Sequence, residues 1–261
     1  MRESSSQLAG LRQRISRLAA SGPESRRAEG RLASGHASFD GALGGGLATG
    51  HLHEFFADDA LDATSAAAFA ALLALRVPGK APLVWIRTVD AARRAGHIYA
   101  PGIAELGGDP GRLLLVETPD PKMLLACAND AARCAGSAAV IVESWGAFPL
   151  LDLTAGRRLA LGARDAGTTL LVLRLNAAPS PSIAETRWRV AAAPSRALEA
   201  DAPGVPRFDL ELLRWRAGAA GGRWRLDWKH DQNGFGDAAL SGDLLPLDAR
   251  RAAEPHGAAA A

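Results

Sequence analysis

The sequence has few cysteines, and its N-terminus is polar and charged. Its two cysteines, Cys127 and Cys134, lie seven residues apart in a stretch of helical pattern. That separation is too long for a disulfide within a helix and does not match the spacing of metal ligands. No apolar run approaches the roughly 20 residues that span a membrane, and the N-terminus does not have the pattern of a signal peptide. We therefore expect a cytoplasmic protein without a disulfide, a metal site or a membrane contact.

Lysine is also scarce, because basic charge is carried almost entirely by arginine. The lysines are Lys80, Lys122 and Lys229, and the formal net charge of the 261 residues is +2. This charge is too close to neutral to imply a nucleic-acid partner by itself. Hydrophobic residues make up 48% of the chain, which is enough for a sizeable core.

Short apolar segments alternate with segments of helical pattern over most of the chain. The pattern predicts strands over 51–56, 83–87, 112–117, 138–143 and 168–175, and helices over 64–75, 121–135 and 154–166. This alternation is typical of βαβ units, whose parallel sheet is covered by helices on both faces.

The pattern changes after residue 176, where apolar and polar residues alternate. Residues 183–190, 208–216 and 223–229 therefore predict antiparallel strands with one face in water. Residues 231–261 are rich in Ala, Gly, Asp and Pro and contain little to bury, so we expect a disordered tail there.

The N-terminal residues 1–20 predict a separate amphipathic helix. Leu8, Leu11, Ile15 and Leu18 recur at three- and four-residue steps, with arginines between them. Residues 21–31 read as a linker, and residues 32–230 as the core with its C-terminal strands. We expect the helix to be a docking element, either for another copy of the chain or for a partner.

Three stretches resemble the core of RecA-type proteins. Residues 32–56 contain a glycine-rich turn before a strand, and the match is carried by Phe39, Asp40, Ala42, Leu43, Gly44, Gly45, Gly46, Leu47 and Gly50. Residues 89–120 resemble the segment after the next core strand, and residues 138–148 resemble the Walker B strand, with Glu143 at its end. The resemblance implies a three-layer α/β core with a mostly parallel sheet.

The nucleotide-binding residues of that family are not conserved in this alignment. The phosphate loop G-x-x-x-x-G-K-[ST] is replaced by Ala57, Asp58, Asp59, Ala60, Leu61, Asp62, Ala63 and Thr64. Such a loop needs inward backbone N–H groups and one lysine for the phosphates. The family has a catalytic acid two residues after the position of Asp90, and here that position is occupied by Ala92. We therefore expect no ATPase activity and no cofactor, although Asp90 and Glu143 could be a remnant metal pair.

A further stretch, Thr186-Arg187-Trp188-Arg189-Val190 followed by Pro194 and Ser195, resembles a C-terminal signature of the ImuA family. The resemblance implies a non-catalytic accessory role in SOS-induced translesion synthesis. Its implied partners are an ImuB-like inactive polymerase relative and RecA or an error-prone polymerase. A SulA-like inhibitor of cell division and a divergent DNA-dependent ATPase remain as alternatives.

Three Arg-Trp-Arg triplets lie on the predicted C-terminal strands. They are centred on Trp188, Trp215 and Trp224, and their arginines are Arg187, Arg189, Arg214, Arg216, Arg223 and Arg225. On a strand the tryptophan faces one way and both arginines the other. The tryptophans could pack in the core beneath a solvated face, or the arginines could bind DNA phosphates or an acidic protein. Between those two partners we favour the protein, and expect DNA contact to be weak or indirect.

Overall fold

The computed structural model describes residues 30–195, 197, 202 and 204–238, and its central feature is a nine-stranded sheet. The strand order is β11-β10-β9-β8-β3-β7-β6-β4-β5. The predicted N-terminal helix, with Leu8, Leu11, Ile15 and Leu18, lies outside the described residues. Within the described residues, no helix is long and apolar enough to cross a membrane.

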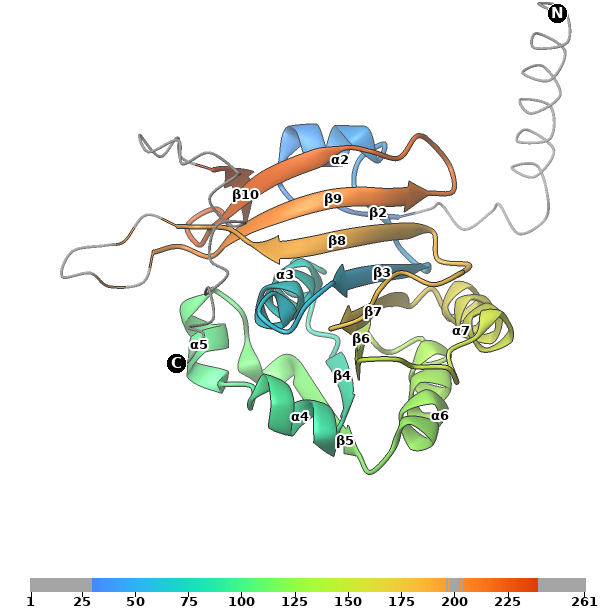
Figure 1. The fold of residues 1–261 in the computed structure, drawn as a ribbon. Coiled ribbons are helices and arrows are strands. Elements are labelled where there is room, and N and C mark those ends of the chain that lie inside the picture. Colours follow the sequence, from blue (N-terminus) through green and yellow to red (C-terminus); the bar gives the residue numbers. More distant parts are fainter. Residues whose placement is uncertain (1–29, 196, 198–201, 203, 239–261) are drawn as a thin grey trace, which may run out of the picture.

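Six neighbouring strands of this sheet are parallel. They are β3 (Leu52–Ala57), β4 (Leu83–Thr88), β5 (Leu113–Thr118), β6 (Ala139–Trp145), β7 (Thr169–Leu175) and β8 (Thr186–Ala192). Strands β3, β4, β6 and β7 are buried over nearly their whole length, because helices lie on both sides of them. The predicted α/β architecture with a mostly parallel sheet is confirmed (Figure 1).

Helices divide the core into two apolar clusters, one on each face of the sheet. Helix α3 (Ala63–Leu75) packs on one face and buries Phe69 and Leu73, while α6 (Pro121–Ala132) and α7 (Leu153–Ala166) cover the other. Two short helices, α4 (Val89–Ala95) and α5 (Ala100–Glu105), connect β4 to β5. The three long helices lie where the sequence predicts them, whereas α4 and α5 were not predicted as helices.

The C-terminal strands extend the same sheet. Strand β9 (Arg207–Trp215) pairs antiparallel with β8 and with β10 (Arg223–Lys229). Strand β8 itself pairs parallel with β3 through His53–Thr186 and Phe56–Arg189. The expectation of three antiparallel strands is therefore wrong for one side of β8, because alternation shows which face is buried but not the direction of a neighbour.

The predicted disordered tail, residues 231–261, starts before the folded core ends. Strand β11 (Gly234–Asp237) pairs with β10, and Phe235 is buried against Phe69, Phe208 and Trp228. One large aromatic side chain fixes this strand, although its neighbours are glycines and an aspartate. The core therefore continues at least to Asp237 rather than ending at residue 230.

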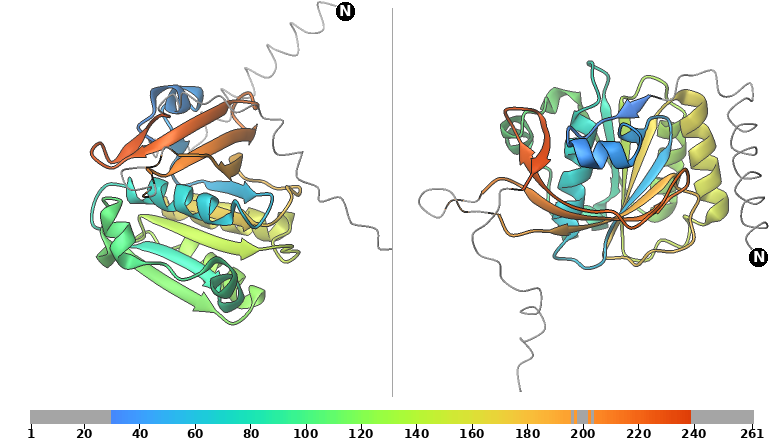
Figure 2. Two further views of the ribbon diagram at one scale, coloured as in Figure 1. Left: turned by 60° about the vertical axis from the view of Figure 1, so that its left-hand side comes forward. Right: turned by 90° about the horizontal axis from the view of Figure 1, so that it is seen from above.

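The N-terminal part of the core lies beside these last strands. Helix α2 (Ala37–Ala42) follows β1 (Arg31–Leu32), which pairs with β2 (Leu47–Ala48) in a small separate sheet. Phe39 of α2 stacks on Trp188 and contacts Trp224 edge to face. Figure 2 shows α2, in blue, lying over β9 and β10, in orange.

Candidate functional site

The loop between β3 and α3 occupies the position of the phosphate loop. Asp59 folds it back on itself, because its Oδ1 accepts hydrogen bonds from the N–H groups of Leu61 (2.7 Å) and Asp62 (3.2 Å). No residue from 57 to 64, all of which are described, has a positive φ. The amides that a phosphate loop directs toward its ligand are thus partly occupied by an aspartate of the same loop.

Two further aspartates attach this loop to the C-terminal strands. Asp58 Oδ2 pairs with Arg189 Nε at 2.6 Å, and Asp62 Oδ1 accepts from the backbone N–H of Ala192 at 2.7 Å. Arg189 also pairs with Glu211 at 2.6 Å. The three loop carboxylates therefore all have partners within the protein.

The side chains at the first glycine position and at the lysine position point into the core. Ala57 and Ala63 are buried, and both belong to the cluster beneath α3. A lysine side chain at position 63 would displace packed atoms instead of reaching a phosphate. Thr64, the one match to the motif, is exposed.

The acids of the expected metal pair lie in different surroundings. Asp90 is exposed on α4 and pairs with Arg94 at 2.8 Å and with Arg93 at 3.8 Å. Glu143 is buried at the end of β6, where Oε2 accepts from Trp85 Nε1 at 2.8 Å, and burial raises its pKa. Ala92 is buried. The described residues contain no group of three or more His, Cys, Asp or Glu that could hold a metal ion.

The tryptophans of the triplets face the core. Trp188 is fully buried and contacts Trp224, while Trp224 Nε1 donates to Ser38 Oγ at 3.2 Å. The arginines lie on the opposite face of β8, β9 and β10, which are adjacent strands as the triplet argument required. The core-packing interpretation is therefore correct for the tryptophans.

Half of the arginine face is neutralised by acids that lie in register with the arginines. Glu211 pairs with both Arg189 (2.6 Å) and Arg223 (3.0 Å). Asp209 receives two hydrogen bonds from Arg225, of 2.6 and 2.7 Å. The six guanidinium groups do not form one positive surface, because three of them share these carboxylates.

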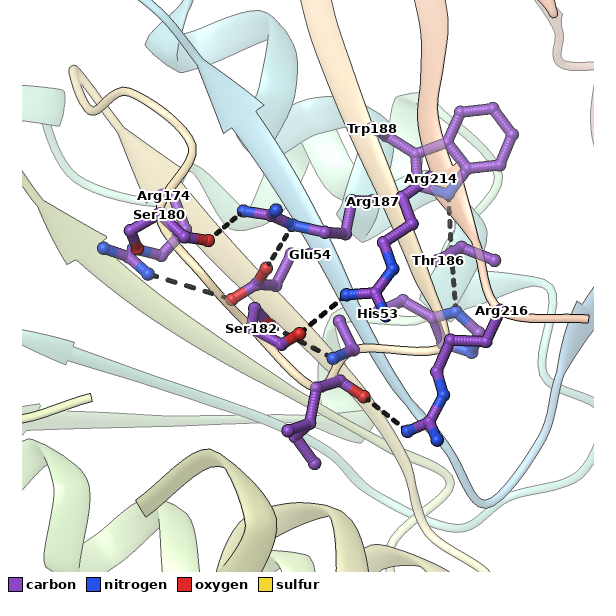
Figure 3. Close-up of polar contacts among 12 residues, drawn as sticks. His53, Glu54, Arg174, Ser180, Ser182, Thr186, Arg187, Trp188, Arg214 and Arg216 are labelled. Atoms are coloured by element: carbon purple, nitrogen blue, oxygen red, sulfur yellow. Dashed lines mark hydrogen bonds and ion pairs between the residues drawn. The ribbon is translucent and has the colours of Figure 1, made fainter. Parts of the chain in front are cut away.

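The other half, at the start of β8 and the end of β9, carries an excess of positive charge (Figure 3). Arg187 Nε pairs with Glu54 at 2.9 Å, and the more deeply buried Arg174 lies 3.8 Å from the same carboxylate. Both guanidinium groups lie over the ring of Phe56, at 5.0 and 5.7 Å. Burial lowers the pKa of Arg174.

Arg214 and Arg216 complete this cluster at the surface. Arg214 donates to the carbonyl of Ser182 (2.8 Å) and Arg216 to that of Ile183 (3.2 Å), and both side chains are exposed. We call Arg174, Arg187, Arg214 and Arg216 the arginine cluster. Within the described residues, Glu54 is the only carboxylate that pairs with any of its four members. A net positive site of this kind suits an acidic protein surface or a phosphate.

The sequence interpretation did not include Arg174 and Glu54. Each is a charged residue inside an otherwise apolar strand, in LHEFFA and TLLVLRL, and that interruption was a usable signal. Their mutual proximity follows only from the pairing of β3 with β7, which places Phe56 opposite Arg174.

Comparison of the sequence and the structure with known proteins identifies relatives of this chain. The chain is 37% identical over 207 residues to the Protein ImuA of two Caulobacter vibrioides strains, covering 75% of this chain and 82% of theirs. No family model matches the chain. Among solved structures, the RadB recombinase superposes with a TM-score of 0.53 over 80% of this chain and all of that chain, at 17% identity.

Proposed function

Because this chain belongs to the ImuA family, we propose that it is a non-catalytic accessory protein of DNA-damage-induced mutagenesis. It would act in the cytoplasm as an adaptor that binds other proteins of translesion synthesis. Its partners on this proposal are an ImuB-like protein and RecA or an error-prone polymerase. A RecA-like fold without phosphate-loop residues favours binding over hydrolysis.

The single observation that carries the non-catalytic part is the closed loop between β3 and α3. Asp58, Asp59 and Asp62 all bond within the protein, and three carboxylates beside a triphosphate would repel it. Together with Ala63 and Ala92 this removes both phosphate binding and activation of water.

The partner site that we propose is the surface part of the arginine cluster. Arg214 and Arg216 are exposed and hydrogen-bond to backbone carbonyls, so an acidic partner could form ion pairs with them without displacing a carboxylate. Arg223 and Arg225 already share carboxylates on the same face, so a new acidic partner gains less from them.

The two pairs of arginines provide a test with a matched control. The double variant Arg214→Gln/Arg216→Gln should bind an ImuB-like partner about 10- to 100-fold more weakly and should reduce damage-induced mutagenesis. The control, Arg223→Gln/Arg225→Gln, removes the same formal charge from the same face and should retain most of the binding. Circular dichroism and urea denaturation would verify that both variants fold.

Salt dependence of binding separates a protein partner from DNA. If the cluster grips DNA, the wild type should bind single strands tightly, with log affinity falling by about 0.7 per phosphate contact as log salt rises. Retention of the protein partner together with loss of such DNA binding in Arg214→Gln/Arg216→Gln would show that the cluster is a DNA-binding site and that its assignment to a protein partner is wrong.

A further inference from the structure

A cavity that is partly open to solvent lies between α3 and the segment that contains α5, and the exposed Thr64 and Tyr99 are part of its lining. Its volume is about 270 Å³, and it runs along α3 from Thr64 in the first turn to Leu75 in the last. Ala67, Ala68 and Ala71 form the α3 side of the cavity, and Ile98 and Ile103 form the opposite side. Three alanines at neighbouring positions leave a space that larger apolar side chains would fill.

A single carboxyl group at the lining of this apolar space lacks a complete set of hydrogen bonds. Glu143 is 1% exposed, and its Oε2 accepts from Trp85 Nε1 at 2.8 Å. Its Oε1 is buried and has no hydrogen-bond partner among the described residues. A buried acceptor in this state has lost its water without replacement, so a ligand that bonds to it would recover that loss.

The other charged group beside the cavity is already occupied. Arg87 donates to Glu117 Oε1 at 2.9 Å and to the carbonyl of Gly96 at 2.8 Å. Its charge is therefore committed to the edge strand β5 and to the loop before α5. This leaves Glu143 Oε1 as the atom best placed to select a ligand.

We propose that this cavity binds a small, neutral aromatic molecule that carries one hydroxyl group. The hydroxyl pairs with Glu143 Oε1, and the ring lies among Trp85 and the alanines of α3. A hydroxyl can donate to a carboxylate or accept from a carboxylic acid, so it suits Glu143 in either protonation state. The lining is mostly apolar and its one arginine, Arg87, is already paired, which favours a neutral ligand over a charged one. This inference does not depend on the adaptor role proposed above.

The test uses 4-ethylphenol as the probe and ethylbenzene, which has the same frame without the hydroxyl, as its comparison. Calorimetry and ligand-detected NMR should show that 4-ethylphenol binds at least tenfold more tightly. Equal affinity for the two molecules, or no binding at millimolar concentration, would overturn the proposal. Adaptor function is measured by partner binding, so failure here leaves that proposal standing.

Two variants and a control locate the binding site. Ala71→Leu fills the cavity without touching Glu143 and should abolish binding of 4-ethylphenol. Glu143→Leu should weaken 4-ethylphenol at least tenfold while ethylbenzene keeps or gains affinity. Asp90→Asn removes an exposed acid outside the cavity lining and should change neither. Undiminished binding of 4-ethylphenol to Ala71→Leu would place the probe elsewhere and end the proposal.

Discussion

His53 is a buried histidine whose hydrogen bonds require the neutral ring. Nε2 faces the carbonyl of Ala48 at 2.8 Å and must donate to it, so Nδ1 accepts from Thr186 Oγ1 at 2.8 Å. The same hydroxyl oxygen accepts from Trp188 Nε1 at 2.7 Å, as Figure 3 shows. Burial lowers the pKa of His53 to about 4. This chain of bonds joins β2, β3 and β8 in one protonation state.

The lowered pKa of His53 predicts a loss of stability in mild acid. As the pH falls from 6.5 toward 4, His53 binds a proton in the unfolded chain but stays neutral in the folded protein. The free energy of unfolding should therefore fall by about 2 to 3 kcal/mol from this group by pH ~4.5, while above pH ~7 it has no effect.

Urea denaturation of the wild type and of His53→Gln, at pH ~7 and at pH ~4.5, measures this loss of stability. The variant should be about 1 to 2 kcal/mol less stable near neutrality, because the hydrogen bonds to Ala48 and Thr186 are altered. Its stability should then fall less steeply with acid than that of the wild type. Parallel pH profiles would contradict a proton-linked role for His53.

At the scale of elements, the turn before β2 depends on the backbone of Gly46. Gly44 and Gly46 both have positive φ, of 67° and 119°. A Cβ at Gly46 would collide with the backbone carbonyl of Leu32, whereas a Cβ at Gly44 meets no atom within 4 Å. The close approach of β1 therefore requires glycine at one position, and only the local conformation favours it at the other.

This contrast predicts different costs for two identical substitutions. Gly44→Ala should lower the free energy of unfolding by about 1 kcal/mol, from the left-handed conformation alone. Gly46→Ala adds the collision and should cost about 3 kcal/mol or more. Equal losses for the two variants in urea denaturation would mean that β1 moves aside freely.

The elements that the sequence predicts well are those with a strong apolar pattern. Strands β4, β6 and β7 and helices α3, α6 and α7 each carry a run or stripe that can be read locally. Strand β11 depends on Phe235 alone, and its packing site is formed by residues far away in the chain. Pairing across strands is not local either, so the contact of Glu54 with Arg174 could not be predicted from the sequence. Asp209 and Glu211 alternate within one strand, however, and could have been recognised as neutralising the arginines.

At the scale of the whole molecule, a RecA-like core carries a loop whose three carboxylates oppose nucleotide binding. Calorimetry with Mg-ATP at millimolar concentration should give no binding heat, because Asp58, Asp59 and Asp62 would repel the phosphates. Ala63→Lys should not restore binding, since position 63 is buried and Asp58 and Asp62 still attach the loop to β8. A micromolar dissociation constant for the wild type would contradict this reading.

The contact between the first and last parts of the described core has a consequence for synthesis. The N–H of Phe235 donates to the carbonyl of Ser34 at 2.9 Å, and His36 meets Asp237 at 2.8 Å across 201 positions of sequence. Ribosomes add about 5 to 20 residues per second, so Asp237 is synthesised roughly 10 to 40 seconds after His36. A message broken before codon 235 would yield a chain whose Phe69 and Trp228 lack their aromatic cover. Such a chain should expose apolar surface, so we expect it to be cleaved by proteases faster than a chain that includes β11.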